Sequence, residues 1–418
     1  MLLIPDPSPR APPWHTSRFT GLFTDVGRTP MRPHDPDVAV HSGMLLPCGP
    51  RSESLPVGGA AWEGDHAELA CLGEAIERLQ PYRLPCDGIR ESSFENWNFD
   101  EPAVDPARWV LFHAEQYAQP GFPFEALTRK SICRWICFRV AQTGEPIWIP
   151  EDMAFLFSSG THRYAPAIST GLSCGRLGST TLLRGLQEVI ERDGVVGAWW
   201  SRYALEEFEA SEVLRSLEPS IESRIIRPNL LYRFYRADSS FSSNVTIVTV
   251  EGEDREGYCF SIGSSCRETQ AASWNKSILE AVNGRHFVRF LKSNADPASQ
   301  PKHMPHDFAE HALYYSLHPD ELSRTVLRKP QAARERGTLA VENLNSISER
   351  LGKDRQVLFR AMTPPAIAQE FRDWHVLKVV VPGLQPLHGS HDFPFLGGEL
   401  WKPRGLSEWK SSPPHPFP

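Results

Sequence analysis

Residues 169–200 read STGLSCGRLGSTTLLRGLQEVIERDGVVGAWW, and this stretch indicates a strand-to-helix junction near the middle of the chain. Its first part is rich in small residues, which let backbone N–H groups approach a ligand closely. From 179 to 202 the apolar residues recur at helical spacing, and the N-terminus of such a helix favours an anion. Ser179 or Thr180 is the expected helix cap. The junction is not a P-loop, because no lysine follows its glycines.

The five-residue element Glu-x-x-Glu-Arg occurs in this helix and also in an earlier predicted helix at 65–80. Its members are Glu188, Glu191 and Arg192 in the one helix, and Glu74, Glu77 and Arg78 in the other. Residues three apart share a helix face, so each helix holds two carboxylates side by side with an arginine near them. A hard cation, Mg²⁺ or Ca²⁺, removes the repulsion between such carboxylates, and arginine suits a phosphate oxygen. A solvated polar face has the same spacing, so spacing alone leaves both interpretations open.

A third predicted helix, at 267–292, places Lys276, Glu280 and Asn283 on one face. The alternative interpretation is an ordinary surface ion pair of small energetic value. Strand-like runs are interspersed with the three helices, at 37–40, 146–149, 231–236, 244–250, 257–262 and 375–381. This alternation predicts the α/β class.

Composition excludes several kinds of protein. A net charge of −7 and the lack of a basic stripe argue against nucleic-acid binding. No apolar run of about 18 residues is present, so we expect no membrane span, and the proline-rich start does not resemble a signal peptide. The eight cysteines are scattered without a Cys-x-x-Cys pair, which argues against a disulfide framework or structural zinc. We therefore expect a reducing, cytoplasmic location.

Prolines cluster at both ends of the chain and set the expected boundaries. Residues 1–36 are predicted to be an irregular N-terminal segment, residues 37–400 one domain, and residues 401–418 an extended tail. The tail ends in PPHPFP, with alternating prolines at 414, 416 and 418. Such a pattern holds a polyproline II conformation and loses little entropy on docking, although a disordered tail has the same composition.

Four segments together resemble the signatures of the YcaO family. They are CLGEAIER at 71–78, the stretch 169–200 quoted above, KSILEAVNGR at 276–285 and VVVPGLQP at 379–386. They occur in family order and cover most of the chain. The resemblance implies a layered α/β fold of mixed sheets and packed helices, with one ATP-binding catalytic domain over 37–400. It also implies that the protein binds ATP and Mg²⁺.

The resemblance assigns expected roles to residues of this chain. The metal ligands would be Glu74, Glu77, Glu188 and Glu191; Arg78 and Arg192 would meet phosphate; Ser169, Lys276, Glu280 and Asn283 would complete the nucleotide site. Three positions depart from the family pattern, with Cys71 for serine, Lys276 for arginine and Asn283 for glutamine. Lysine keeps the charge but loses the bidentate fork of arginine. These departures affect individual contacts more than binding as such.

The proline tail is similar to that of azoline-forming members, which implies that Pro418 presents its terminal carboxylate beside the reacting amide. The resemblance then implies ATP-dependent cyclodehydration of Cys, Ser or Thr in a ribosomal precursor peptide. His388 and His391 are either general bases or, as we expect, ordinary surface or core histidines. The rival hypotheses are a thioamide- or amidine-forming enzyme and a non-catalytic nucleotide-binding scaffold of a synthetase complex.

The same resemblance bears on the partners. The sequence contains no recognisable peptide-capture segment ahead of the YcaO region. We therefore expect a separate partner subunit, E1-like or ocin-ThiF-like, that binds the leader of the precursor peptide. The resemblance also allows a flavin dehydrogenase as a further partner, and a homodimer.

Overall fold

The computed structural model describes residues 23–47, 54–79, 88–156, 162–294, 303–334, 341–363, 374–401 and 404–418. Residues 1–22 of the predicted irregular segment lie outside these ranges, as do Cys48 and Cys86. The six cysteines that are described are free thiols. Within the same ranges, every helix is too short or too polar to span a bilayer.

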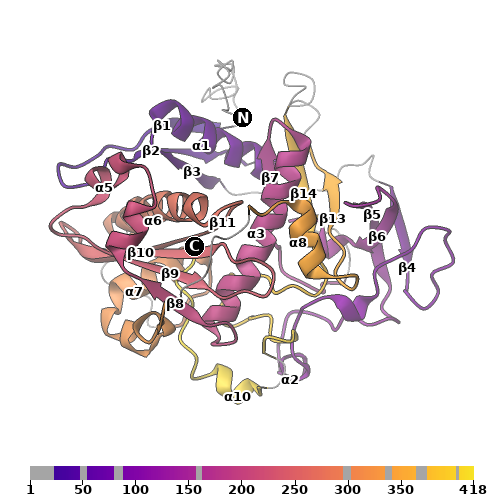
Figure 1. Ribbon diagram of the computed structural model, residues 1–418. Helices are drawn as coiled ribbons and strands as arrows, with labels where there is room; N and C mark the ends of the chain where they lie inside the picture. Colours follow the sequence, from indigo (N-terminus) through magenta and orange to yellow (C-terminus); the bar gives the residue numbers. More distant parts are fainter. Residues whose placement is uncertain are drawn as a thin grey trace.

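The described residues form three sheets and three long helices (Figure 1). The first sheet is antiparallel, with the order β1 (Phe23–Arg28), β2 (Ala39–Leu45) and β3 (Leu55–Ala61). Helix α1 (Gly64–Leu79) packs on this sheet through Cys71, Leu72 and Ala75. Gly59 of β3 makes the close approach possible, because a Cβ there would lie 2.3 Å from the backbone nitrogen of Cys71.

The second sheet has the order β11-β10-β9-β8-β12. Its strands are β8 (Leu205–Phe208), β9 (Leu231–Ala237), β10 (Val245–Asp254), β11 (Gly257–Cys266) and the short β12 (Gln331–Ala332), which alone pairs in parallel. Alternation along β9 explains its two buried faces. Phe234 packs with helix α6 (Gln270–Asn294), whereas Tyr235 packs with helix α3 (Gly178–Trp199).

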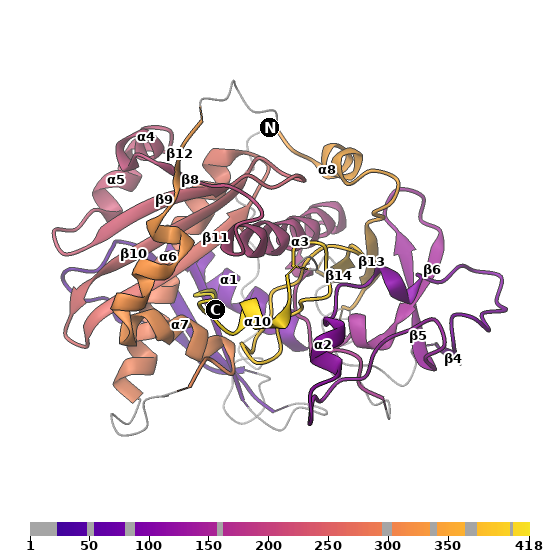
Figure 2. The ribbon, with the colours of Figure 1, turned by 90° about the horizontal axis from the view of Figure 1, so that it is seen from below.

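The third sheet has the order β4-β5-β13-β14-β7, with β6 paired to β5. Its strands are β4 (Ile89–Ser92), β5 (Cys133–Val140), β6 (Pro146–Pro150), β7 (Leu172–Gly175), β13 (Leu358–Ala361) and β14 (His375–Val380). Leu377 and Val379 of β14 share a core cluster with α3. Helix α3 therefore lies between the second and third sheets, as the view in Figure 2 also shows.

Shorter elements complete the structure. The helices are α2 (Ala114–Tyr117), α4 (Ala210–Arg215), α5 (Pro219–Ile225), α7 (Phe308–Leu317), α8 (Leu344–Leu351) and α10 (Leu406–Trp409). Short 3₁₀ turns occur at Pro106–Arg108, Glu151–Met153, Pro319–Arg324 and Val326–Arg328. The mixed sheets and packed helices confirm the predicted α/β class.

Three local predictions need correction. Helix α3 begins at Gly178 after Leu177, so neither Ser179 nor Thr180 caps it; the chain already turns two residues beyond the end of β7. Strand β1 lies inside the segment that was predicted to be irregular, because its six residues FTDVGR contain no proline. The C-terminal tail is not extended throughout, since it contains α10 and buries Trp409 and Phe417 in the core cluster around α3.

Candidate functional site

The end of α1 meets strand β3 and helix α6. Glu74 accepts a hydrogen bond of 2.9 Å from the backbone N–H of Gly58, and Nη2 of Arg78 lies 3.7 Å from its other oxygen. A Cβ at Gly58 would lie 3.6 Å from the side-chain amide of Asn283 in α6. Three of the predicted residues, Glu74, Arg78 and Asn283, are therefore brought together around one glycine.

Glu77 of α1 and Glu188 of α3 belong to separate helices, but their charges lie close enough to interact. Burial raises the pKa of Glu77 well above its ordinary range; Arg78 opposes the shift, and the charge of Glu188 adds to it. Burial likewise raises the pKa of Glu188, against the attraction of Arg192, whose Nε lies 4.0 Å from Oε1. Two half-buried carboxylates that repel each other are an arrangement that a divalent cation would relieve.

Lys378 of β14 is a member of this site that the sequence reasoning missed. Its side chain is 1% exposed, and its ammonium donates to the backbone carbonyls of Ile168 (2.6 Å) and Thr170 (2.8 Å). Burial lowers the pKa of Lys378 to about 7, although the charges of Glu188 and Glu77 oppose this shift. A lysine in the otherwise apolar run VLKVVV at 376–381 was the signal that could have identified it.

Ser169 lies on the loop that Lys378 holds. The carbonyls on either side of it are the two acceptors of the lysine, and its own carbonyl accepts from the N–H of Leu172. Gly171 completes the turn with φ of +83°, and a Cβ there would lie 2.0 Å from the carbonyl oxygen of Val379. Lys378 thus joins the loop of Ser169 to the carboxylates of α1 and α3.

Glu191 is the most firmly held of the four glutamates. It is buried, and it accepts hydrogen bonds from the hydroxyl of Ser264 (2.6 Å) and the N–H of Cys266 (3.2 Å). Nη1 of Arg192 lies 3.8 Å from the same carboxylate. Each oxygen has a further lone pair, so a metal ion is still compatible with these bonds.

Lys276 and Glu280 of α6 form an ion pair with each other. The pKa of Glu280 is lowered even though burial opposes the shift, because Lys276, Arg267 and Arg192 all attract its charge. The attraction of Arg192 links Glu280 of α6 electrostatically to α3. Lys276 therefore has Glu280 as its ion-pair partner in this structure.

Arg267 was also missed by the sequence reasoning, which placed it at the start of the third helix without a role. It follows β11, and burial lowers its pKa; Arg184 of α3 adds to this, whereas Glu191 and Glu280 oppose it. Arg184 is itself paired with Glu268 at 2.8 Å. Two arginines thus border the carboxylates on the side of the second sheet, at positions with no distinctive local spacing.

We call Glu74, Glu77, Glu188 and Glu191 the carboxylate cluster. Its members come from two helices and are surrounded by five cationic side chains: Arg78, Arg192, Arg267, Lys276 and Lys378. Hard divalent cations favour oxygen ligands, and the surrounding cations favour phosphate oxygens. In donor chemistry, the residues present therefore fit Mg²⁺ with a polyphosphate.

Pro418 is not brought to the carboxylate cluster by any contact among the described residues. It is exposed, whereas the four residues before it are buried. His388 and His391 are 1% and 5% exposed, and burial lowers the pKa of each, so their rings are neutral core groups, in line with the expectation for them. The catalytic role of Pro418 stays a prediction.

Comparison with known proteins adds family and fold. Residues 58–385 match the family described as YcaO cyclodehydratase, ATP- and Mg²⁺-binding. No curated protein matches the sequence. Among solved structures, a heterocyclase in complex with substrate and cofactor has a TM-score of 0.66 at 15% identity, and the match covers 96% of this chain and 56% of that one. The chain thus spans little more than half the length of that heterocyclase.

Two further structures share the fold. YcaO from Methanopyrus kandleri, bound with AMPPCP and Mg²⁺, has a TM-score of 0.56 at 18% identity, with 86% of both chains covered. The E. coli microcin synthetase McbBCD complex has a TM-score of 0.59 at 14% identity, with 94% of this chain and 96% of that one covered. These identities support the fold alone, whereas the family match extends over well over half of the sequence. The chain belongs to the YcaO family of ATP- and Mg²⁺-binding cyclodehydratases.

Proposed function

We propose that this chain is the azoline-forming subunit of a peptide cyclodehydratase. In this reaction the side chain of Cys, Ser or Thr in a precursor peptide attacks the preceding backbone carbonyl carbon. This attack closes the five-membered ring; the former carbonyl oxygen is then phosphorylated and leaves as phosphate, and loss of the amide proton forms the C=N bond of the thiazoline or (methyl)oxazoline. For each ring the peptide loses one water, and ATP is converted to ADP and phosphate.

The observation that carries the proposal is the mutual charge interaction of Glu77 and Glu188, which belong to separate helices, with Arg78 and Lys378. ATP, when bound, supplies the phosphoryl group that makes the amide oxygen a leaving group, and Mg²⁺ offsets the phosphate charge. The carboxylate cluster is the proposed ligand set for Mg²⁺. Because such chemistry requires mainly positioning and charge stabilisation, no enzyme nucleophile is needed.

The cationic side chains have two proposed roles. Arg78 and Arg192 hold phosphate oxygens, whereas Lys378 fixes the loop of Ser169 so that its backbone and hydroxyl face the nucleotide. Lys276, Glu280 and Asn283 complete the nucleotide site from α6. In this proposal the ion pair between Lys276 and Glu280 opens or rearranges when the nucleotide binds.

The C-terminal tail favours azoline formation over the thioamide and amidine alternatives. Its Pro-x-Pro-x-Pro sequence is built into the core cluster around α3, so the chain end has a fixed place instead of being a loose appendage. Pro418 is proposed to present its carboxylate to the reacting amide.

A separate subunit is proposed to bind the leader of the precursor peptide. One comparison supports this: the match covers 96% of one chain of the E. coli microcin synthetase McbBCD, and that structure is described as a complex.

The test is mass spectrometry of a precursor peptide co-expressed with its partner subunit and this chain, either intact or lacking the last three residues. Loss of one water per modified Cys, Ser or Thr, dependent on ATP and on those residues, is the expected result. Exchange of oxygen for sulfur would identify a thioamide-forming enzyme instead. An unmodified peptide together with a complex that tolerates Glu188→Gln would favour the scaffold.

A further inference from the structure

The last six residues, PPHPFP at 413–418, form a segment that accepts hydrogen bonds almost exclusively. Proline has no backbone N–H, so only His415 and Phe417 carry a donor there. Protein groups that recognise such a segment must therefore donate to its carbonyls or enclose its side chains. The structure provides both kinds of contact.

Three consecutive carbonyls of the tail each accept a hydrogen bond from a buried side chain. The indole Nε1 of Trp199 donates to Pro413 at 3.1 Å, and the hydroxyl of Tyr315 donates to Pro414 at 2.7 Å. Nδ1 of His311 donates to the carbonyl of His415 at 2.6 Å. Trp199 belongs to α3, and the other two donors belong to α7.

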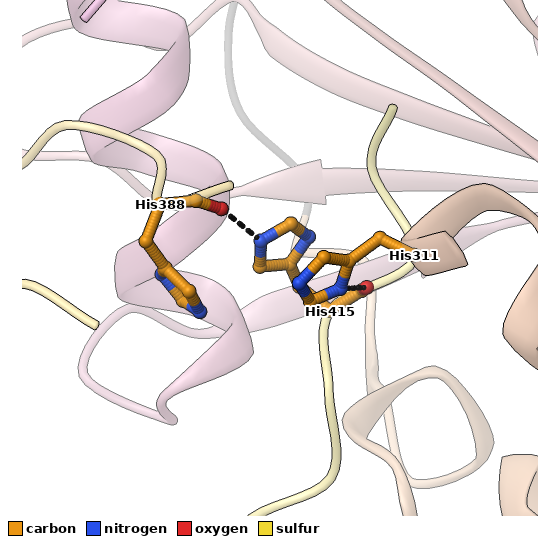
Figure 3. A group of neighbouring side chains, drawn as sticks. All are labelled: His311, His388 and His415. Atoms are coloured by element: carbon orange, nitrogen blue, oxygen red, sulfur yellow. Dashed lines mark hydrogen bonds between the residues drawn. The ribbon is translucent and has the colours of Figure 1, made fainter. Parts of the chain in front are cut away.

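The side chains of the tail are held as well. Nε2 of His415 donates to the carbonyl of His388 at 2.8 Å, and the ring of His415 stacks on that of His311 with centroids 3.8 Å apart (Figure 3). Phe417 is 2% exposed within the core cluster around α3. A carbonyl can only accept, so these bonds fix the tautomers of His311 and His415.

The three histidines also resemble a metal site, since one nitrogen of each lies within 4.8 Å of the others. Their orientation argues against this. A zinc ion requires nitrogen lone pairs that converge on one point about 2.0–2.1 Å away, in the plane of each ring. The rings of His311 and His415 are parallel to within 3° at 3.8 Å, so their lone pairs lie in separate planes and do not converge.

We propose that Trp199, Tyr315 and His311 form a latch that holds the proline tail in one register. Burial lowers the pKa of His311 to about 3, so its ring stays neutral with the single N–H that the tail uses. Phe417 and His415 prevent a shift by one residue, because prolines would then occupy their places. The contacts of the latch do not depend on the proposed function. Only the use of the fixed position of Pro418 in the reaction rests on it.

Hydrogen exchange of the His415 and Phe417 amides in the full-length chain tests the latch. Tyr315→Phe removes one donor with little change in shape, and His311→Leu removes another. One neutral hydrogen bond corresponds to roughly a two- to tenfold rise in the exchange rate through tail opening. His311→Asn restores an N–H near the position of Nδ1, so we expect its exchange rate to lie closer to that of the unaltered chain than to that of the leucine variant.

Tyr314→Phe is the matched control, because it removes a hydroxyl from the neighbouring position of the same helix. Equal exchange in Tyr315→Phe and Tyr314→Phe would overturn the latch. So would a change in exchange caused by EDTA or Zn²⁺, since the histidines would then be metal ligands.

Activity separates the latch from the proposed function. If the unaltered chain formed no azoline while the exchange rates followed the donors, the proposed function would fall and the latch would stand. If azolines formed but the exchange rates were equal in all variants, the latch would fall and the proposed function would stand. Where both hold, Tyr315→Phe should lower kcat for the peptide more than it changes KM for ATP.

Discussion

Replacing Glu188 by glutamine should make the protein more stable without nucleotide and less stable with it. Glutamine keeps the shape of the side chain and removes one negative charge from the carboxylate cluster. If the carboxylate cluster binds Mg²⁺ with ATP, the negative charge that lowers the stability of the protein without ligand is required for ligand binding. The two effects therefore have opposite signs.

The magnitude follows from the surroundings of Glu188. Arg192 lies 4.0 Å away, which corresponds to an attraction of about 4 kcal/mol at an effective dielectric constant of 20. Burial and the charge of Glu191 nevertheless outweigh this attraction, because the pKa of Glu188 is raised. A raised pKa means that the folded protein prefers the neutral form, by about 1.4 kcal/mol for each pKa unit. We therefore expect the glutamine variant to have a higher free energy of unfolding than the parent without ligand.

With Mg²⁺–ATP bound, the parent should be the more stable of the two proteins. A ligand at one hundred times its Kd stabilises the folded state by about 2.7 kcal/mol. The unaltered protein should gain this amount from Mg²⁺–ATP, and Glu188→Gln should gain little. The assay is thermal or urea unfolding of both proteins, with and without Mg²⁺–ATP, and with Glu349→Gln on the exposed face of α8 as the control. A variant that is less stable than the parent without ligand, or that gains as much from the ligand, would refute the reasoning.

Three further predictions concern other parts of the structure. Lys378→Met should leave the carbonyls of Ile168 and Thr170 without their donor, at about 1–3 kcal/mol each, and speed hydrogen exchange in their loop; unchanged exchange would show that the lysine does not hold it. Burial lowers the pKa of His391 to about 4, whereas an unfolded chain protonates it near 6.5. The contribution of neutral His391 to the free energy of unfolding should thus be fully present above pH 6.5 and be lost, by up to ~3 kcal/mol, towards pH 4. Urea unfolding at pH 7 and pH 5 should show a smaller fall in this free energy for His391→Gln than for the parent. Gly171→Ala should lower the soluble yield or the Tm strongly, because a Cβ there meets a carbonyl at 2.0 Å and φ is positive; a Tm equal to that of the parent would contradict the strain.

The sequence alone was sufficient for the elements that depend on local spacing. Helices α1, α3 and α6 were predicted within a few residues of their observed bounds, because their apolar stripes follow the helical period. The pairing of two carboxylates on one face of α1, and again on α3, follows from the same period. The helix start at Gly178 was not predicted, since capping preferences are weak compared with the geometry of the preceding strand.

Only the tertiary structure decided which of these faces meet. Glu77 and Glu188 are more than one hundred residues apart, and nothing in local spacing predicts that the charge of one comes within range of the other. The same holds for Lys378, which sequence reasoning placed in a strand without a role, and for the donors that hold the tail. A helix is formed by hydrogen bonds between near neighbours, whereas packing between elements depends on the shape of every surface at once. The sequence therefore determined what each helix presents, and the fold determined what it faces.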